Sequence, residues 1–210
     1  MKLYDMTLAP NPRRVRMFLA EKGLAVPMEQ VDIQKGENLS PSYLAINPRG
    51  VVPTLVLDDG SILDESLAIC RYFEGLHPEP NLFGRAPLEA ARVESWQRRM
   101  EFEGMFNVAA VFRNTRPAYS NRGAPGAGAP TPQIPALAER GMLLARQWLD
   151  TLEKRLSQSE FVAGDRFTVA DVTAIVSLDF ARWVGLKAED GWPTVAAWQA
   201  RMRERPSYKA

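Results

Sequence analysis

The sequence has little of the residues that build covalent cross-links or metal sites. Among its 210 residues, cysteine occurs once, at Cys70, and histidine once, at His77. A single cysteine cannot form an internal disulfide, and zinc sites built on several cysteines are excluded with it. One histidine also disfavours a histidine-based metal site. We therefore expect no bound metal and a reducing compartment.

An excess of charge of one sign and a long apolar run are missing as well. The 26 Lys and Arg residues nearly balance the 25 Asp and Glu residues, which leaves a net charge of +1. This balance indicates neither a nucleic-acid nor a membrane partner. No apolar run reaches the roughly 18 residues of a membrane span, and the charges at Lys2 and Asp5 argue against a signal peptide. We expect a cytoplasmic protein.

The composition that is present is that of an ordinary globular protein, with 46% hydrophobic and 24% charged residues. Residues 1–77 alternate strand and helix signals in the order βαβαββα. We expect strands at 2–6, 28–33, 54–57 and 61–63. We expect a first helix that starts near Pro12 and ends at Gly23, a second helix over 41–46 and a third over 65–76. The sequence Asp58-Asp59-Gly60 predicts an antiparallel hairpin. This half is therefore expected to be an α+β domain.

The second half is expected to be entirely helical. Pro78 and Pro80 mark a linker, which we place at 78–86, and a helical domain is expected over 87–210. Helical spacing covers 88–112, 138–156, 169–184 and 194–205. The proline-rich and glycine-rich stretch 114–135 is expected to be mostly structureless. It is either a surface loop or a flexible cover over a substrate pocket.

Two local features of the first half could bind a peptide. Pro53 precedes a strand and cannot donate to its ladder. A cis Val52–Pro53 bond would leave the Val52 backbone to pair with an extended peptide, although general statistics favour a trans bond. Glu65 and Ser66 open a helix, whose start attracts carboxylates, and the glutamate could accept an ammonium group. The alternative for this pair is helix capping alone.

A third feature lies between the first strand and the first helix. A thiol placed at a helix N-terminus ionises more easily. Asn11 could donate a hydrogen bond to such a thiolate, and Thr7 could do so through its hydroxyl. The alternative is a turn in which Asn11 caps the helix.

Taken in order, these features resemble the cytosolic glutathione transferase family over nearly the whole chain. The motifs that carry the resemblance lie at 12–16, 21–23, 47–53, 65–69, 161–165, 168–171 and 193–206. The resemblance implies a thioredoxin-like glutathione-binding domain, a helical domain, glutathione as co-substrate, and a homodimer joined by the third helix and the long helix of the second domain.

The resemblance also implies roles for individual residues. Glu65 and Ser66 would hold the γ-glutamyl end of glutathione, and the Val52 backbone, before a cis Pro53, would pair with its cysteinyl part. The candidates for holding the glycyl carboxylate are Arg49, Lys35 and Gln34.

The residue that activates the thiol is not one of the family's usual ones. The usual serine position falls on Ala9 and the usual cysteine position on Pro10, neither of which can activate a thiol. The chain is most similar to bacterial members, such as the nu class, that use an asparagine just before the first helix. Asn11 matches that position, although the accompanying threonine is Ala9 here. We therefore predict Asn11 as the activating residue, with Thr7 second.

Two further groups of residues complete the predictions. Thr168 and Asp171 match a capping box and are expected to be structural, as is Cys70, which we place in the core. The acceptor pocket is expected between the domains, although methionines and aromatic residues at helical spacing are more often core. Its candidates are Met105, Phe106, Phe112, Arg113 and Tyr119.

The function predicted from these residues is conjugation of the glutathione thiolate to a small hydrophobic electrophile. Two alternatives stay open at this point. One is a glutathione-dependent disulfide or peroxide reductase, and the other is a glutathione-binding interaction module without catalysis.

Overall fold

The computed structural model describes all 210 residues and divides into two compact units. Unit 1 comprises Met1–Pro80, Ala124–Pro130 and Ala210, and unit 2 comprises Asn81–Gly123 and Thr131–Lys209. The segment Ala124–Pro130 thus belongs to unit 1, although the residues on both sides of it in the sequence belong to unit 2.

Unit 1 is built on a four-stranded mixed sheet, and its element order is the expected βαβαββα. The elements are β1 (Lys2–Asp5), α1 (Pro10–Glu21), β2 (Met28–Gln30), α2 (Pro41–Leu44), β3 (Thr54–Val56), β4 (Ile62–Leu63) and α3 (Ser66–Leu76). The strand order is β2-β1-β3-β4, with β1 parallel to β2 and the other pairs antiparallel. The structure confirms the thioredoxin-like fold class.

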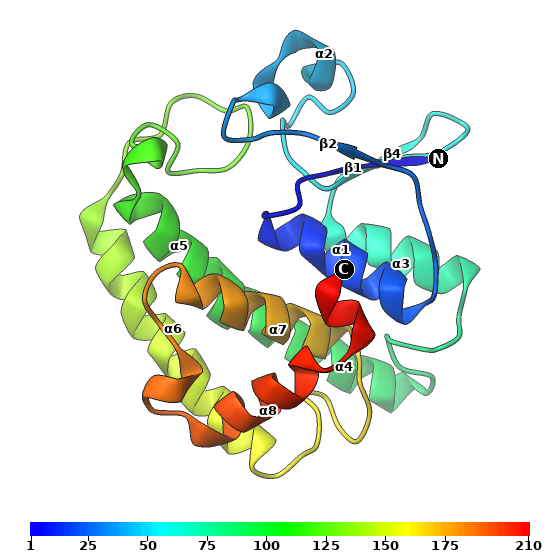
Figure 1. Cartoon of the computed structure of the whole chain (residues 1–210), viewed down its shortest axis with the longest axis vertical. Helices are drawn as coiled ribbons and strands as arrows, with labels where there is room; N and C mark the ends of the chain where they lie inside the picture. The colour runs from blue at the N-terminus through cyan, green and yellow to red at the C-terminus, as the bar shows by residue number, and fades with distance from the viewer. The chain divides into compact units, whose positions relative to one another are not determined.

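The two faces of the sheet are covered by different helices. Side chains alternate along a strand, so Leu3 and Tyr4 point to opposite faces. Figure 1 shows α1 and α3 side by side against one face. On the other face Tyr4 meets Tyr43 of α2, with ring centroids 5.7 Å apart, and both belong to a cluster with Val31 and Val52. The short helix α2 is thereby fixed to the sheet beside residue 52.

The strand register brings four connections to one edge of the sheet. Tyr4 pairs with Thr54, Asp5 with Gln30, and Leu55 with Leu63. The carboxyl ends of β1, β2 and β4 therefore lie at the same edge as the amino end of β3. As a result, the start of α1, the turn after β2, the Val52–Pro53 bond and the start of α3 meet there.

Local sequence patterns predicted the ends of some helices and strands correctly and the ends of others incorrectly. The hairpin between β3 and β4 is confirmed, with Gly60 at φ +84° and the Asp59 carboxylate accepting the Ser61 N–H at 2.8 Å. In contrast, α1 begins at Pro10 after the N-cap Ala9, so the interpretation of Asn11 as the helix cap is wrong. Asn11 instead lies in the first turn.

Unit 2 is all-helical, as expected. It contains α4 (Pro87–Arg99), a π-helical turn (Met100–Met105), α5 (Phe106–Thr115), α6 (Pro135–Leu156), α7 (Val169–Arg182), α8 (Pro193–Arg203) and short 3-10 turns. The helix expected over 88–112 is thus interrupted by the π turn and continues to Thr115. Residues 169–178 of α7 are buried at every position, which confirms its place in the core. None of the helices combines the length and apolar character needed to cross a bilayer.

The segment 114–135 contains only short pieces of regular structure. Pro117–Tyr119 form a 3-10 turn, and Arg122 and Thr131 form a β-bridge. Most of the other residues between α5 and α6 lie in turns, bends or irregular chain, as the composition predicted.

Candidate functional site

A polar network, buried at Asp5 and Arg16, holds the turn that leads from β1 into α1. The Asp5 carboxylate accepts hydrogen bonds from Arg16 Nη1 and Gln30 Nε2, both at 2.5 Å. Gln30 Oε1 in turn accepts the N–H and the hydroxyl of Thr7, both at 2.9 Å, and Arg16 Nη2 donates to the Thr7 carbonyl at 2.7 Å. The hydroxyl proton of Thr7 is therefore engaged inside this network. Sequence reasoning missed Asp5 and Gln30, because nothing local signals that they meet.

The start of α1 offers one amide and one side-chain donor. Pro10 and Pro12 have no N–H, and Ala9 supplies no side-chain cap. The Asn11 N–H makes no hydrogen bond within the chain. The Asn11 side chain is exposed, and its Oδ1 accepts a hydrogen bond from Arg14 Nη1 at 3.2 Å. Because the buried Arg14 occupies the oxygen, the Asn11 NH2 group is left to donate outward.

The main chain at residue 52 has a cis bond and no hydrogen-bond partner within the chain. The Val52–Pro53 bond is cis, which confirms what the resemblance implied. Strand β3 begins only at Thr54, and the N–H and C=O of Val52 make no hydrogen bond within the chain. A backbone donor and acceptor on one residue are therefore available at the sheet edge.

The carbonyl oxygen of Val51, the residue before Val52, accepts three hydrogen bonds. Val51 O accepts the Tyr43 hydroxyl at 2.6 Å, the Thr54 hydroxyl at 3.0 Å and Asn47 Nδ2 at 3.3 Å. Tyr43, Thr54 and Asn47 are all buried. These three donors fix the loop that carries Val52, and no local sequence pattern indicated that they act together.

The start of α3 is uncapped. Glu65 is the N-cap residue without a side-chain capping bond, and the first main-chain bond of the helix runs from Ile69 N–H to Glu65 O. The amides of residues 66–68 and the Ser66 hydroxyl have no acceptor in the chain. Arg49 Nη1 bonds Glu65 and Asp64 carboxylates, each at 2.9 Å, and these two partners raise the pKa of Arg49. The helix start therefore combines unpaired donors, of the kind that can bind an anion, with a neighbouring oriented carboxylate.

The turn after β2 presents Gln34 and Lys35 at the same sheet edge. Their backbone N–H groups donate to Asp32 Oδ1 at 2.9 and 3.1 Å. Lys35 Nζ lies 3.1 Å from Asp32 Oδ2, and this contact raises the pKa of Lys35. Both side chains are exposed.

The segment Ala124–Pro130 rests on the turn that carries Arg49. The Ala127 N–H donates to the Arg49 carbonyl at 2.9 Å. Gly126 has φ +89°, and a Cβ added there would stand 2.6 Å from the same carbonyl oxygen. Only a glycine therefore fits at position 126. The carbonyl that it approaches belongs to Arg49, three residues before Val52 in the chain.

We expect Gly126→Ala to loosen this contact. The positive φ and the collision with Arg49 O together predict a loss of about 1–3 kcal/mol in local stability. Hydrogen exchange at Ala127 should accelerate, and the affinity for glutathione should fall. Gly128→Ala is the matched control, because a Cβ there meets nothing within 4 Å. Equal exchange rates in the two variants would contradict this account of the contact.

Three of the five predicted acceptor residues lie together in unit 2. The Phe112 and Tyr119 rings are 5.1 Å apart, and the Arg113 guanidinium lies 5.2 Å from the centre of the Tyr119 ring. Met105 is buried. Phe106 is 68% exposed, and its ring contacts Phe102 rather than this group.

The capping box at the start of α7 forms as predicted. Asp171 Oδ2 accepts the N–H and the hydroxyl of Thr168 at 2.8 and 2.9 Å, and Oδ1 accepts the Val162 N–H at 2.8 Å. Burial raises the pKa of Asp171 to about 6, against the opposing effect of these hydrogen bonds. Burial also raises the pKa of the Cys70 thiol to about 12, so Cys70 is an inert core residue.

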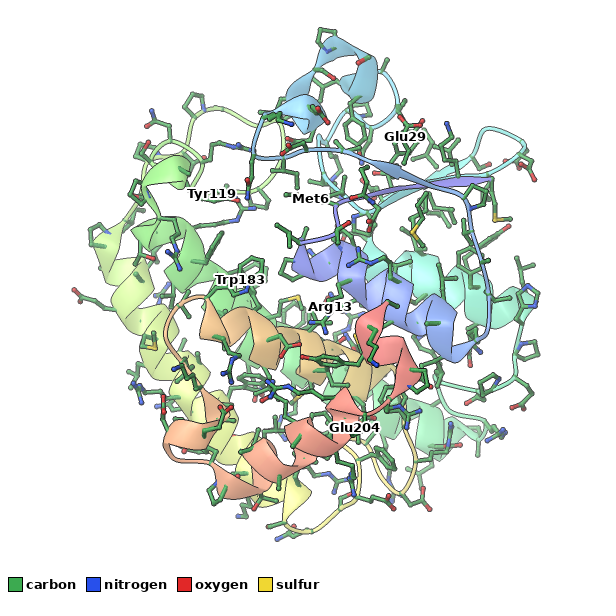
Figure 2. All side chains as sticks on the ribbon, in the orientation of Figure 1. Met6, Arg13, Glu29, Tyr119, Trp183 and Glu204 are labelled. Atoms are coloured by element: carbon green, nitrogen blue, oxygen red, sulfur yellow. The ribbon has the colours of Figure 1, made fainter.

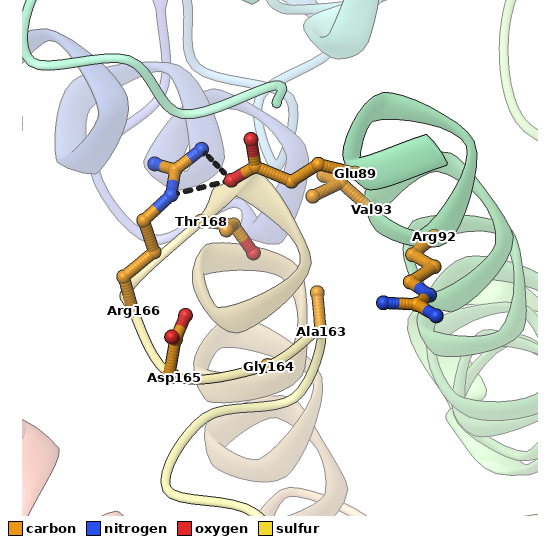
Figure 3. A pocket seen from close by; sticks show the side chains of 8 residues that line it. All are labelled: Glu89, Arg92, Val93, Ala163, Gly164, Asp165, Arg166 and Thr168. Carbon is orange, nitrogen blue, oxygen red and sulfur yellow. Dashed lines mark hydrogen bonds and ion pairs between the residues drawn. The ribbon is translucent and has the colours of Figure 1, made fainter. Parts of the chain in front are cut away.

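A separate cavity of about 280 Å³ lies in unit 2 (Figure 3). Its walls are mostly polar: Glu89, Arg92, Val93, Ala163, Gly164, Asp165, Arg166 and Thr168. Glu89 and Arg166 form an ion pair across it, and Arg166 also bonds Asn81. The cavity contains none of the residues predicted to bind glutathione or the acceptor.

Two family models match the chain. Residues 3–81 match "Glutathione S-transferase, N-terminal domain", and residues 129–206 match "Glutathione S-transferase, C-terminal domain". Together they cover most of unit 1 and more than half of unit 2.

Individual proteins resemble the chain over its full length. Glutathione S-transferase 2 of Saccharomyces cerevisiae is 35% identical, over 100% of this chain and 88% of that protein. A glutathione S-transferase domain-containing protein of Marinobacter aquaeolei superimposes with a TM-score of 0.90 at 37% identity, over 99% of both chains. The glutathione transferase URE2P6 of Phanerochaete chrysosporium, solved in complex with oxidized glutathione, gives a TM-score of 0.81 at 25% identity, over 99% of this chain and 92% of that one.

Proposed function

Because this chain belongs to the glutathione S-transferase family, we propose that it conjugates glutathione, as the thiolate, to a small hydrophobic electrophile. The observation that carries this proposal is the unpaired N–H and C=O of Val52 beside the uncapped start of α3. We also propose that it works in the cytoplasm as a homodimer.

Glutathione would lie along the sheet edge in an extended form. The Val52 N–H and C=O pair with its cysteinyl residue as one more strand would. The Ser66 hydroxyl and the amides of α3 take the γ-glutamyl carboxylate, while Glu65, oriented by Arg49, takes the ammonium group. Since Arg49 is held by two carboxylates, we assign the glycyl carboxylate to Lys35 or Gln34.

The sulfur would then lie at the start of α1, near Asn11. The outward NH2 group and the N–H of Asn11 donate to the thiolate, and the positive end of the helix dipole favours its charge. The Thr7 hydroxyl is engaged by Gln30, so we assign Asn11 alone to the thiolate. We therefore propose that the chain is one of the asparagine-type, nu-like members of the family.

The direct test is conjugation of 1-chloro-2,4-dinitrobenzene. In this reaction the thiol loses its proton to solvent, a C–S bond forms, and chloride leaves with the bonding electron pair. We expect turnover that is saturable in glutathione and faster than the uncatalysed reaction. Saturable binding of glutathione without turnover of this or any other acceptor would reject the conjugating function and favour a binding module.

Ser66→Ala should weaken glutathione binding by about tenfold or more, because a hydroxyl bond to a charged carboxylate is lost. The change should appear in the KM for glutathione, while kcat at saturation changes little. Ser42→Ala serves as control, since Ser42 is exposed and bonds only Ser40. A KM equal to that of the control would remove Ser66 from the site.

A further inference from the structure

Unit 2 carries a cluster of four aromatic rings at the ends of α5 and α7. Phe112 lies 5.1 Å from Tyr119, 5.3 Å from Phe180 and 5.8 Å from Trp183, measured between ring centroids. Phe180 is buried, whereas Trp183 is 39% exposed and Phe112 and Tyr119 are half-buried. Figure 2 shows Tyr119 and Trp183 within unit 2. The cluster therefore joins the core on one side and presents ring surface on the other.

Three guanidinium groups border these rings. Arg113 and Arg122 lie 5.2 and 5.7 Å from the centroid of Tyr119, and Arg116 lies 5.7 Å from that of Phe112. Arg113 Nη1 donates to the Arg122 carbonyl at 3.1 Å, which ties the two arginines together across the turn. The guanidinium groups of Arg113 and Arg122 thus both lie close to the Tyr119 ring.

The two guanidinium groups influence each other. Burial lowers the pKa of Arg113, Tyr119 opposes this lowering, and the charge of Arg122 adds to it. A carboxylate bound to both guanidinium groups would offset their mutual repulsion. An anion there also interacts more strongly with a guanidinium than it would in water.

We infer that the acceptor of this enzyme is an aromatic electrophile that carries a carboxylate, with its ring against Phe112 and Tyr119 and its carboxylate on Arg113 and Arg122. Flat rings pack against the exposed edges and faces of aromatic side chains. Arginine is suited to carboxylates because its planar donors match both oxygens. The inference rests on the proposed conjugating function and narrows its substrate class.

A matched pair of acceptors tests this inference. One is 4-chloro-3,5-dinitrobenzoate, and the other is its methyl ester, which keeps the ring and leaving group but lacks the charge. In both, the glutathione sulfur replaces chloride, and the thiol proton goes to solvent. Each kcat/KM is divided by the uncatalysed rate constant with free glutathione, because the ester activates the ring more strongly.

We expect the wild type to prefer the carboxylate by about tenfold after this correction. Arg113→Gln and Arg122→Gln should each reduce the ratio of the corrected kcat/KM for the carboxylate to that for the ester. A melting temperature close to that of the wild type reports intact folding of each variant. Arg122→Gln keeps the backbone carbonyl that Arg113 contacts. Arg146→Gln, at an exposed position of α6, should leave the preference unchanged.

Two outcomes would overturn the inference in distinguishable ways. Equal corrected rates for both acceptors in the wild type, or a preference that survives both arginine replacements, would reject the anionic acceptor while conjugation itself stands. Conjugation of neither acceptor would reject the proposed function and the inference with it.

Discussion

Replacing Asn11 with alanine should raise the pKa of enzyme-bound glutathione by about one unit and slow conjugation near pH 6.5 by about tenfold to a hundredfold. The variant loses the NH2 group that Arg14 directs outward by bonding Oδ1 at 3.2 Å. The measurement is kcat against pH with 1-chloro-2,4-dinitrobenzene. Because the lost group stabilises the anion, the deficit should be largest at low pH and shrink above the thiol's pKa.

Asn11→Asp separates this effect from helix stability. The aspartate has nearly the same shape, and a negative charge in the first turn favours the helix. It nevertheless repels a thiolate, so conjugation should fall at least as far as in Asn11→Ala, without a lower melting temperature. Superimposable pH profiles for the wild type and both variants would remove Asn11 from the mechanism.

Replacing Asp171 with alanine should destabilise the fold by about 3 kcal/mol or more and lower the melting temperature by about 10 °C. The side chain is fully buried, and three donors from Val162 and Thr168 converge on it. Alanine would leave these donors without an acceptor in a place that water cannot reach. Calorimetric melting gives the measurement.

Asp165→Ala is the matched control for Asp171, because Asp165 is exposed six residues earlier. We expect its stability to stay within about 0.5 kcal/mol of the wild type. Similar melting temperatures for the two variants would contradict the role assigned to the capping box.

The Asp171 carboxylate should also make the stability of the wild type depend on pH. The pKa of Asp171 is raised to about 6 in the folded state, from an unfolded value of about 3.9. The native state therefore binds this proton more tightly, and the contribution of Asp171 to stability declines as the pH rises from about 4 through about 6. The difference in stability between the wild type and Asp171→Ala should accordingly be larger at pH 5 than at pH 7.

The features readable from the sequence were those governed by local patterns. Apolar spacing predicted the order of strands and helices, and Asp59 and Gly60 predicted the hairpin, because near neighbours in the chain determine both. The Val52–Pro53 bond is different, because local statistics favoured trans. Only the likeness of several motifs to a known family indicated the cis form that the structure shows.

The features that the sequence could not show depend on residues far apart in the chain. Asp5, Arg16 and Gln30 form one network only after β1, α1 and β2 have come together. The contact of Ala127 with Arg49 spans 78 positions and has no local signature. The start of α1 was misplaced for a different reason, since Ala9 is not a capping residue type and the more typical Asn11 follows it.

Titration calorimetry with reduced glutathione tests the central claim most directly. If the unpaired main chain at residue 52 and the start of the third helix bind the tripeptide, the wild type should give a saturable isotherm with one binding site per chain. The affinity of Ser66→Ala should be lower. A flat titration with the folded wild type would contradict the account, whatever its activity toward other compounds.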